Sequence, residues 1–246
     1  MKVFSVPANL DVVVTSYGGT GSTFFIKFLS KYKSVNHPHD TGSLKHTAYP
    51  PVSIKPSQKF IYLFGDPVHA TISLFRREFH HLQSQKIQQA ANMNSPIPPS
   101  MTLEEYAEEG VDRFRFREHF FNWYHSSVAN PILFVRYETL FNNLSTISEF
   151  LELPSSFIDE FPKKKKRKSV HNDVSNETLQ QLEKIYGEFK NELEKIPDIK
   201  CLEAKEMDPL KKLLNGLRFY TIRAMYKSRK SMRRVYEEKL KNESTN

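Results

Sequence analysis

The order of short apolar runs, turns and helical patterns constrains the fold most strongly. Asp11 to Thr15 is a β-branched run, and Phe60 to Phe64 is an apolar run rich in aromatic residues. Runs of this length and composition are typical of buried strands. Each is followed by a turn and then by a helical pattern, over Ser22 to Tyr32 and over His69 to Leu82. This repeated order predicts an α/β fold, with a central, mostly parallel sheet flanked by helices.

The later segments continue the same order. Thr102 and Glu105 have the spacing of a capping box and open a long helical stretch that we expect to end near His125. Ile132 to Val135 is the third expected strand. Gln83 to Ser100 is polar and ends in prolines, which predicts a long loop or lid. Apolar residues on one face predict further helices over two segments, Phe141 to Leu151 and Asn176 to Leu193.

Charge is distributed unevenly along the 246 residues. The net charge is +8, yet residues 205–246 alone hold 12 Lys and Arg against 5 Asp and Glu. Lys163 to Lys168 is a second basic segment, with six cations in a row. We therefore expect two parts: a globular domain over residues 1–204 and a basic, amphipathic helical extension over residues 205–246. Because the rest of the chain carries an excess of acid, we expect no specific nucleic-acid partner.

Several classes of protein are excluded by composition. Cys201 is the only cysteine, so no disulfide framework can form within the chain. No apolar run approaches the roughly 18 residues of a membrane span, and Met1 to Leu10 lacks the features of a signal peptide. These observations predict a cytoplasmic protein. The basic C-terminal helix could still touch an anionic membrane surface peripherally or bind an acidic partner.

A glycine-rich segment between the first strand and its helix is the leading candidate for a binding site. Three of the chain's eight glycines lie within four positions there. A flexible turn at a helix N-terminus directs consecutive N–H groups and the helix dipole at one point, which suits a phosphate. A tight turn that only needs positive φ angles is the alternative. The candidate residues are Gly18, Gly19, Thr20, Gly21, Ser22 and Thr23. They lack the lysine of a Walker A motif.

These segments resemble the signatures of sulfotransferases that use 3′-phosphoadenosine 5′-phosphosulfate (PAPS). Their first loop, Pro-Lys/Arg-Ser-Gly-Thr/Ser-Thr, aligns with Gly18 to Thr23. Their second signature, Arg-Asn/Asp-Pro with a serine eight residues beyond the arginine, aligns with Gly65 to Pro67 and with Ser73. Arg136 to Leu140 is similar to a third element, Arg-Tyr-Glu-Asp-Leu. The resemblance implies a P-loop-like fold and transfer of a sulfuryl group from PAPS to a hydroxyl, with no metal.

The resemblance also implies roles for individual residues. Gly19 to Thr23 would hold the 5′-phosphosulfate end of PAPS, and Ser73 would bond its 3′-phosphate. His46 would be the general base, with Lys45 stabilising charge on the leaving phosphate. Asn176 to Phe189 is similar to the C-terminal helix of carbohydrate sulfotransferases, which favours a carbohydrate acceptor.

The chain departs from the family at two cations. Gly19 stands where the first loop has Lys or Arg, and Gly65 stands where the second signature has Arg. Each lost charge-assisted contact is worth about 1.5–3 kcal/mol. Replacement cations are therefore expected from elsewhere in the chain. The candidates are Lys27, Arg76, Arg77 and the Lys163 to Lys168 run, in which Arg167 and Lys168 resemble a family segment that closes over the 3′-phosphate.

Several alternatives remain open from the sequence. His37, His39 and Asp40 are rival bases in the same loop as His46, and they could also be read as metal ligands. The Lys163 to Lys168 run could be a solvated loop or a polyanion-binding patch rather than part of a cofactor site. The whole chain could be a degenerate sulfotransferase fold that binds a nucleotide or polyanion without catalysis. A P-loop-like kinase is a further alternative.

Overall fold

A computed structural model of the chain describes residues 6–51, 55–87, 96–127, 129–163, 173–205 and 217. These residues contain a four-stranded sheet in the order β1-β2-β3-β4. The strands β1 (Val12–Ser16), β2 (Lys59–Phe64) and β3 (Ile132–Arg136) are parallel, and β4 (Ile199–Leu202) runs antiparallel to β3. The predicted mostly parallel sheet is confirmed. Strand β4 was not predicted.

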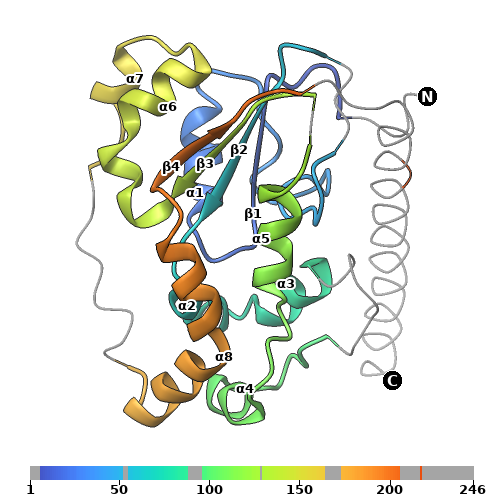
Figure 1. The fold of residues 1–246 in the computed structure, drawn as a ribbon, viewed down its shortest axis with the longest axis vertical. Helices are drawn as coiled ribbons and strands as arrows, with labels where there is room; N and C mark the ends of the chain where they lie inside the picture. The colour runs from blue at the N-terminus through green and yellow to red at the C-terminus, as the bar shows by residue number, and fades with distance from the viewer. Residues whose placement is uncertain are drawn as a thin grey trace, which may run out of the picture.

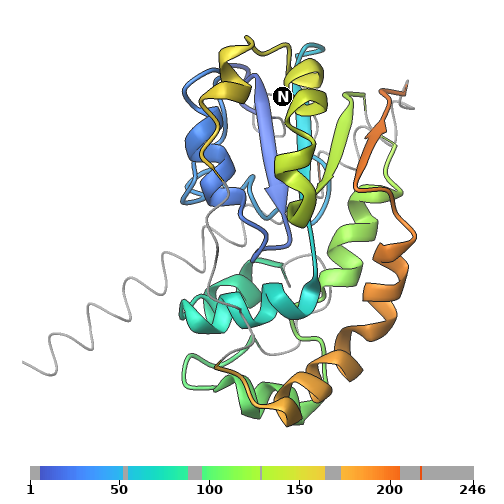
Figure 2. The same ribbon diagram turned by 90° about the vertical axis from the view of Figure 1, so that its left-hand side faces the viewer.

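Alternating side chains of the strands form two apolar layers. In β2, Phe60, Tyr62 and Phe64 belong to one core cluster, while Ile61 and Leu63 belong to the other. This period of two is expected of a sheet that is covered on both faces. Figures 1 and 2 show helices on both sides of the sheet. One face is covered by α5 (Phe116–Tyr124) and α8 (Asn176–Glu194), the other by α1 (Ser22–Leu29), α6 (Leu144–Leu151) and α7 (Ser156–Asp159).

Three further helices lie beyond one end of the sheet, in the lower half of Figure 1. They are α2 (Pro67–Arg76), α3 (His80–Ile87) and α4 (Leu103–Glu109). Strand β2 leads directly into α2, so this is the end where the parallel strands finish. Ligands of open α/β sheets bind at the carboxyl ends of the strands. The fold therefore places the glycine-rich turn after β1 where a ligand is expected.

Some predicted helices are shorter than expected. The helix predicted over residues 69–82 is divided into α2 and α3 because Glu78 adopts a left-handed conformation, with φ 57°. Helix α3 also includes residues 83–87, so the predicted loop over 83–100 was wrong there, and residues 88–95 lie outside the described part. The capping box at Thr102 and Glu105 is confirmed. The helix that it opens ends at Gly110, with φ 69°, rather than near His125.

Two further predicted helices are present, and a third lies almost wholly outside the described residues. Helix α8 confirms the one predicted over 176–193, and the segment 141–151 is the end of a 3₁₀ helix (Tyr137–Asn142) followed by α6. The basic helix predicted over residues 205–246 lies outside the described residues, apart from 205 and 217, so it stays a prediction. No helix within the described part of the chain is long and apolar enough to span a membrane.

Candidate active site

The glycine-rich turn connects β1 to α1 through three left-handed glycines. Gly18, Gly19 and Gly21 have φ angles of 103°, 74° and 72°. Gly21 is the N-cap of α1 and has no side chain to bond the first turn. These conformations are the ones that glycine adopts without steric cost.

The backbone of this turn presents a row of N–H groups without acceptors. The first N–H of α1 with a backbone acceptor belongs to Phe25, which donates to Gly21 O at 3.1 Å. Among the described residues, none of the N–H groups from Gly19 to Phe24 has a hydrogen-bond acceptor. Consecutive unpartnered donors at the positive end of a helix form an anion-binding site. The turn therefore has the geometry of an anion-binding site.

Hydroxyl groups of the turn differ in their availability. Thr20 is 2% exposed and donates its hydroxyl to Leu63 O at 3.3 Å, so it fastens the turn to β2. Ser22 is 5% exposed and accepts a hydrogen bond from the Ser16 hydroxyl at 3.1 Å. Thr23 is half-buried and lies one residue further into the helix. Thr23 is thus the most exposed of the three predicted ligands that carry a hydroxyl group.

Steric contact excludes a larger residue at position 19. A Cβ atom built on Gly19 would lie 2.5 Å from the Cα of Ala70 on α2. Such a contact with backbone requires the two segments to move apart. A lysine or arginine at this position, which the resemblance to sulfotransferases leads one to expect, is therefore incompatible with the way the turn packs on α2.

Lys45 brings a cation to this turn from another loop. Its ammonium Nζ lies 2.5 Å from Thr23 Oγ1 and 2.8 Å from Pro38 O. Its carbonyl accepts hydrogen bonds from the Ser16 N–H and the Thr15 hydroxyl, both at 3.0 Å. Burial lowers the pKa of Lys45 from 10.5 to about 8, even though the nearby Asp40 carboxylate opposes this change. Lys45 is therefore still mainly protonated at pH 7.

His46 is held in one tautomer beside the same turn. Its Nδ1 lies 2.7 Å from Ser16 O, and because a carbonyl only accepts, Nδ1 carries the proton. Nε2 has no hydrogen-bond partner among the described residues. Burial and the positive charge of Lys45 hold the pKa of His46 well below 6.5. The ring is therefore neutral, with the lone pair on Nε2, as a general base requires.

Helix α3 contributes residues that the sequence did not indicate. Gln83 donates its amide N–H to Tyr17 O at 2.9 Å and packs against Gly18. One turn later, Lys86 Nζ lies 3.4 Å from the carboxylate of Asp40. The charge of Lys86 is close enough to lower the pKa of both Lys45 and His46. Lys86 is thus a second cation near the turn.

Helix α2 divides its predicted ligands between two faces. Ser73 and Arg77 are three and seven residues beyond Ala70, so they lie on the face that packs against the turn. Arg77 donates to Ser73 O at 2.9 Å, and its charge also lowers the pKa of Lys45. The Ser73 hydroxyl has no hydrogen-bond partner among the described residues. The structure thus brings these two predicted ligands to the same side of α2 as the glycine-rich turn.

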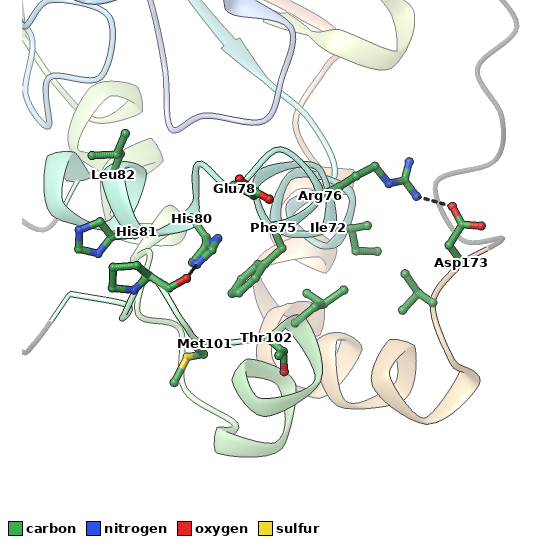
Figure 3. Close-up of a pocket in the computed structure, with 13 residues that line it drawn as sticks. Ile72, Phe75, Arg76, Glu78, His80, His81, Leu82, Met101, Thr102 and Asp173 are labelled. Atoms are coloured by element: carbon green, nitrogen blue, oxygen red, sulfur yellow. Dashed lines mark hydrogen bonds and ion pairs between the residues drawn. The ribbon is translucent and has the colours of Figure 1, made fainter. Parts of the chain in front are cut away.

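Arg76 points to a different region, shown in Figure 3. Its guanidinium lies 3.4 Å from the carboxylate of Asp173, which precedes α8. Together with Ile72 and Phe75, Arg76 lines a cavity of about 680 Å³ between α2, α3 and the segment that leads into α4. The structure does not bring Arg76 to the turn, so we assign this cavity no part in the reaction.

At the second family signature, an acidic side chain occupies the space beside Gly65. A Cβ on Gly65 would lie 2.7 Å from Glu138 Oε1, and this carboxylate accepts the N–H of Asp66 at 2.9 Å. The buried hydroxyl of Tyr17 donates to Gly65 O and accepts the Gly65 N–H at 2.9 Å. Tyr17, which directly precedes the glycine-rich turn, thus links this turn to the segment that contains Gly65.

The rival bases are placed differently from His46. His37 and His39 are exposed, whereas Asp40 is 4% exposed and contacts Lys45 and Lys86. No cluster of three or more His, Cys, Asp or Glu side chains in the described part of the chain could hold a metal ion. Arg167 and Lys168, predicted to contact the cofactor, lie outside the described residues.

Comparison with protein families shows to which family the chain belongs. A family model described as a sulfotransferase domain matches residues 42–197, which is more than half of the chain. The chain therefore belongs to the sulfotransferase family, whose general activity is transfer of a sulfuryl group. The match includes Lys45, His46, Gly65, Ser73 and Arg77 and begins after the glycine-rich turn. Searches of curated proteins and of solved structures gave no match.

Proposed function

We propose that this chain transfers the sulfuryl group of PAPS to an acceptor hydroxyl and releases adenosine 3′,5′-bisphosphate. The observation that carries the proposal is the 2.5 Å contact between Lys45 Nζ and Thr23 Oγ1. It supplies a cation beside the row of free N–H groups, which would otherwise lack the charge that the family has at position 19.

Binding of the donor follows from this arrangement. The N–H groups from Gly19 to Phe24 would hold the 5′-phosphosulfate, with Lys45 neutralising its charge. Ser73 and Arg77, which share a helix face, would hold the 3′-phosphate. PAPS supplies the sulfuryl group and a phosphate that is a good leaving group. Lys45 would stabilise the charge that grows on the phosphate oxygen as the S–O bond breaks.

His46 is the proposed general base. Its neutral ring and its fixed tautomer leave Nε2 able to accept the proton of the acceptor hydroxyl as the hydroxyl oxygen attacks sulfur. The Nδ1–H bond to Ser16 O orients the ring through the same turn that would bind the donor. A buried, neutral imidazole stays deprotonated below pH 6.5, so activity should not fall between pH 7 and pH 6.

The acceptor class is proposed to be a carbohydrate. The support for it is the likeness of Asn176 to Phe189 to the C-terminal helix of carbohydrate sulfotransferases. Incubation with radiolabelled PAPS and a panel of oligosaccharides, phenols and hydroxysteroids tests this class. Transfer only to phenols or steroids would contradict the carbohydrate assignment and leave the reaction type intact.

The reaction itself is tested with the variant His46→Asn, whose amide N–H can still donate to Ser16 O. Loss of the base should lower kcat by 10²–10⁴-fold, while the affinity for adenosine 3′,5′-bisphosphate should stay within about threefold. His81→Asn is the matched control, because His81 Nδ1 makes the same kind of bond to Ile97 O away from the turn. Full turnover by His46→Asn would remove His46 from the mechanism.

A second candidate is a protein that binds the nucleotide without turnover. It is favoured by Gly65, which stands where the family has an arginine and leaves the carboxylate of Glu138 as the nearest side chain to this position. A negative charge there opposes binding of the 3′-phosphate. Calorimetric binding of adenosine 3′,5′-bisphosphate without transfer to any acceptor would support this candidate. A preference for ATP with magnesium would favour a kinase over both.

A further inference from the structure

Asp40 carries a buried negative charge next to the cations of the site. Its side chain is 4% exposed, and a buried carboxylate is stable only when it is paired. One oxygen accepts the backbone N–H of Lys45 at 2.8 Å, and the other lies 3.4 Å from Lys86 Nζ. Asp40 thus joins the loop of Lys45 to helix α3.

Lys45 is fixed along its whole length by these contacts. Asp40 holds its N–H, whereas Ser16 and Thr15 hold its carbonyl. Its ammonium then reaches Thr23 Oγ1. A shift of the Asp40 carboxylate would move the backbone from which this ammonium extends.

We propose that Asp40 is a positioning residue of the donor site, whose buried carboxylate binds the Lys45 N–H and the Lys86 ammonium and so holds the Lys45 ammonium beside the phosphate-binding turn. This inference rests on the proposed function for its catalytic meaning. It replaces the reading of Asp40 as a rival base or metal ligand, because both carboxylate oxygens are engaged.

The charges around Lys45 make the role measurable. Burial and the cations Lys86 and Arg77 lower the pKa of Lys45, and of the charged groups in the described part of the chain that act on Lys45, Asp40 alone raises it. His46, the next residue, is neutral. Removing the Asp40 charge should therefore lower the pKa of Lys45, and removing the Lys86 charge should raise it. Two variants that only loosened the fold would not shift the pKa of Lys45 in opposite directions.

Asp40→Asn is the informative variant. Asp40 has φ 59°, a conformation that Asn also tolerates, and the amide oxygen of Asn can still accept the Lys45 N–H. The variant therefore removes the charge and keeps the geometry. Lys86→Met removes the opposite charge from α3.

The experiment follows Lys45 by NMR in protein labelled with ¹³C at the lysine ε-carbon, with Lys45→Arg identifying its signal. We expect the pKa of Lys45 to fall by about one unit or more in Asp40→Asn and to rise in Lys86→Met. An unchanged pKa in folded Asp40→Asn would overturn the proposal. This readout needs no nucleotide, so it tests Asp40 even if the proposed function fails.

Calorimetry with adenosine 3′,5′-bisphosphate tests the link to the site. In the wild type, binding should weaken above about pH 8, as Lys45 loses its proton. In Asp40→Asn the pH above which binding weakens should be lower by about one pH unit or more. It should not move in Asp40→Asn combined with Lys45→Arg, because arginine stays charged. A wild type that does not bind the nucleotide would contradict the proposed function alone. An identical limit in wild type and Asp40→Asn would contradict the role of Asp40.

Discussion

Gly19 packs so tightly against Ala70 that a Cβ atom at position 19 would lie 2.5 Å from the Ala70 Cα. Close contact between the turn and α2 therefore rules out a lysine or arginine side chain at this position. Lys45 lies 22 residues after Thr23 in the sequence, and its ammonium contacts the Thr23 hydroxyl. We infer that the chain keeps a cation at the turn while its source has changed.

Substitution of Gly19 tests this packing. Gly19→Ala should destabilise the protein by about 2–4 kcal/mol, because it adds a steric clash to the cost of a left-handed conformation. Gly110→Ala is the matched control: Gly110 has φ 69°, and its nearest new contact would be at 3.9 Å. It should cost only about 1–2 kcal/mol. Equal losses for both variants in urea unfolding would show that Ala70 does not restrict position 19.

Position 65 should behave differently from position 19. The three nearest atoms to a Cβ on Gly65 all belong to the flexible carboxylate of Glu138, and the backbone of Gly65 has no positive φ. Gly65→Arg should therefore fold and should bind adenosine 3′,5′-bisphosphate about tenfold or more tightly, by a contact worth about 1.5–3 kcal/mol. Gly65→Ala should leave the affinity unchanged. An unchanged affinity in Gly65→Arg would contradict the alignment of position 65 with the family arginine.

The Tyr17 hydroxyl is predicted to stabilise the fold. It bonds both the N–H and the carbonyl of Gly65 in a fully buried position. Tyr17→Phe leaves two buried backbone groups without partners and should cost about 2–4 kcal/mol of unfolding free energy. Tyr32→Phe, which removes a hydroxyl that bonds the exposed Glu160, should cost less than about 1 kcal/mol. Similar losses in both variants would contradict the role assigned to Tyr17.

Asp112 makes stability depend on pH. Burial raises the pKa of its carboxyl from 3.8 to about 6, although hydrogen bonds from Arg115, Phe116 and Tyr186 oppose the shift. The folded protein holds this proton more tightly than the unfolded chain does. The contribution of this proton to the free energy of unfolding is therefore fully present below about pH 4 and is lost as the pH rises through 6.

Comparison with Asp112→Asn isolates this contribution. Between pH 4 and pH 7.5 the wild type should lose up to about 3 kcal/mol relative to the variant, as expected for a shift of about two pKa units. Urea unfolding of both proteins at several pH values measures the difference. A difference that is constant with pH would contradict a raised pKa for Asp112.

Much of the fold was predictable because its strands are strongly patterned. The runs that became β1, β2 and β3 are short and apolar and are followed by turns or helices, so their parallel arrangement followed from local sequence. Strand β4 lacked such a signal, since none of its residues is fully buried. Its pairing depends on tertiary contacts: Arg136 bonds the side chain of Asp198 at 2.7 Å and the carbonyls of Leu193 and Ile196.

The parts of the candidate site that are formed by residues close together in the sequence were predictable. The glycines of the turn and the adjacent residues Lys45 and His46 were found from spacing and resemblance. Lys86 and Gln83 were missed because α3 is polar, and the buried residues on its inner face include His80, Gln83 and Ser84. Such a helix has no apolar stripe, and its packing depends on hydrogen bonds to Tyr17 and Ile97 that only the folded chain provides.

The central claim is that Lys45 supplies the cation that the glycine-rich turn lacks. Calorimetry at pH 7 of adenosine 3′,5′-bisphosphate with wild type, Lys45→Ala and Lys31→Ala tests it most directly. Lys31 is an exposed lysine beyond the far end of α1, so its variant controls for net charge. We predict that Lys45→Ala binds about 10–100-fold more weakly and that Lys31→Ala stays within about threefold of wild type. Wild-type affinity in a folded Lys45→Ala protein would contradict the claim.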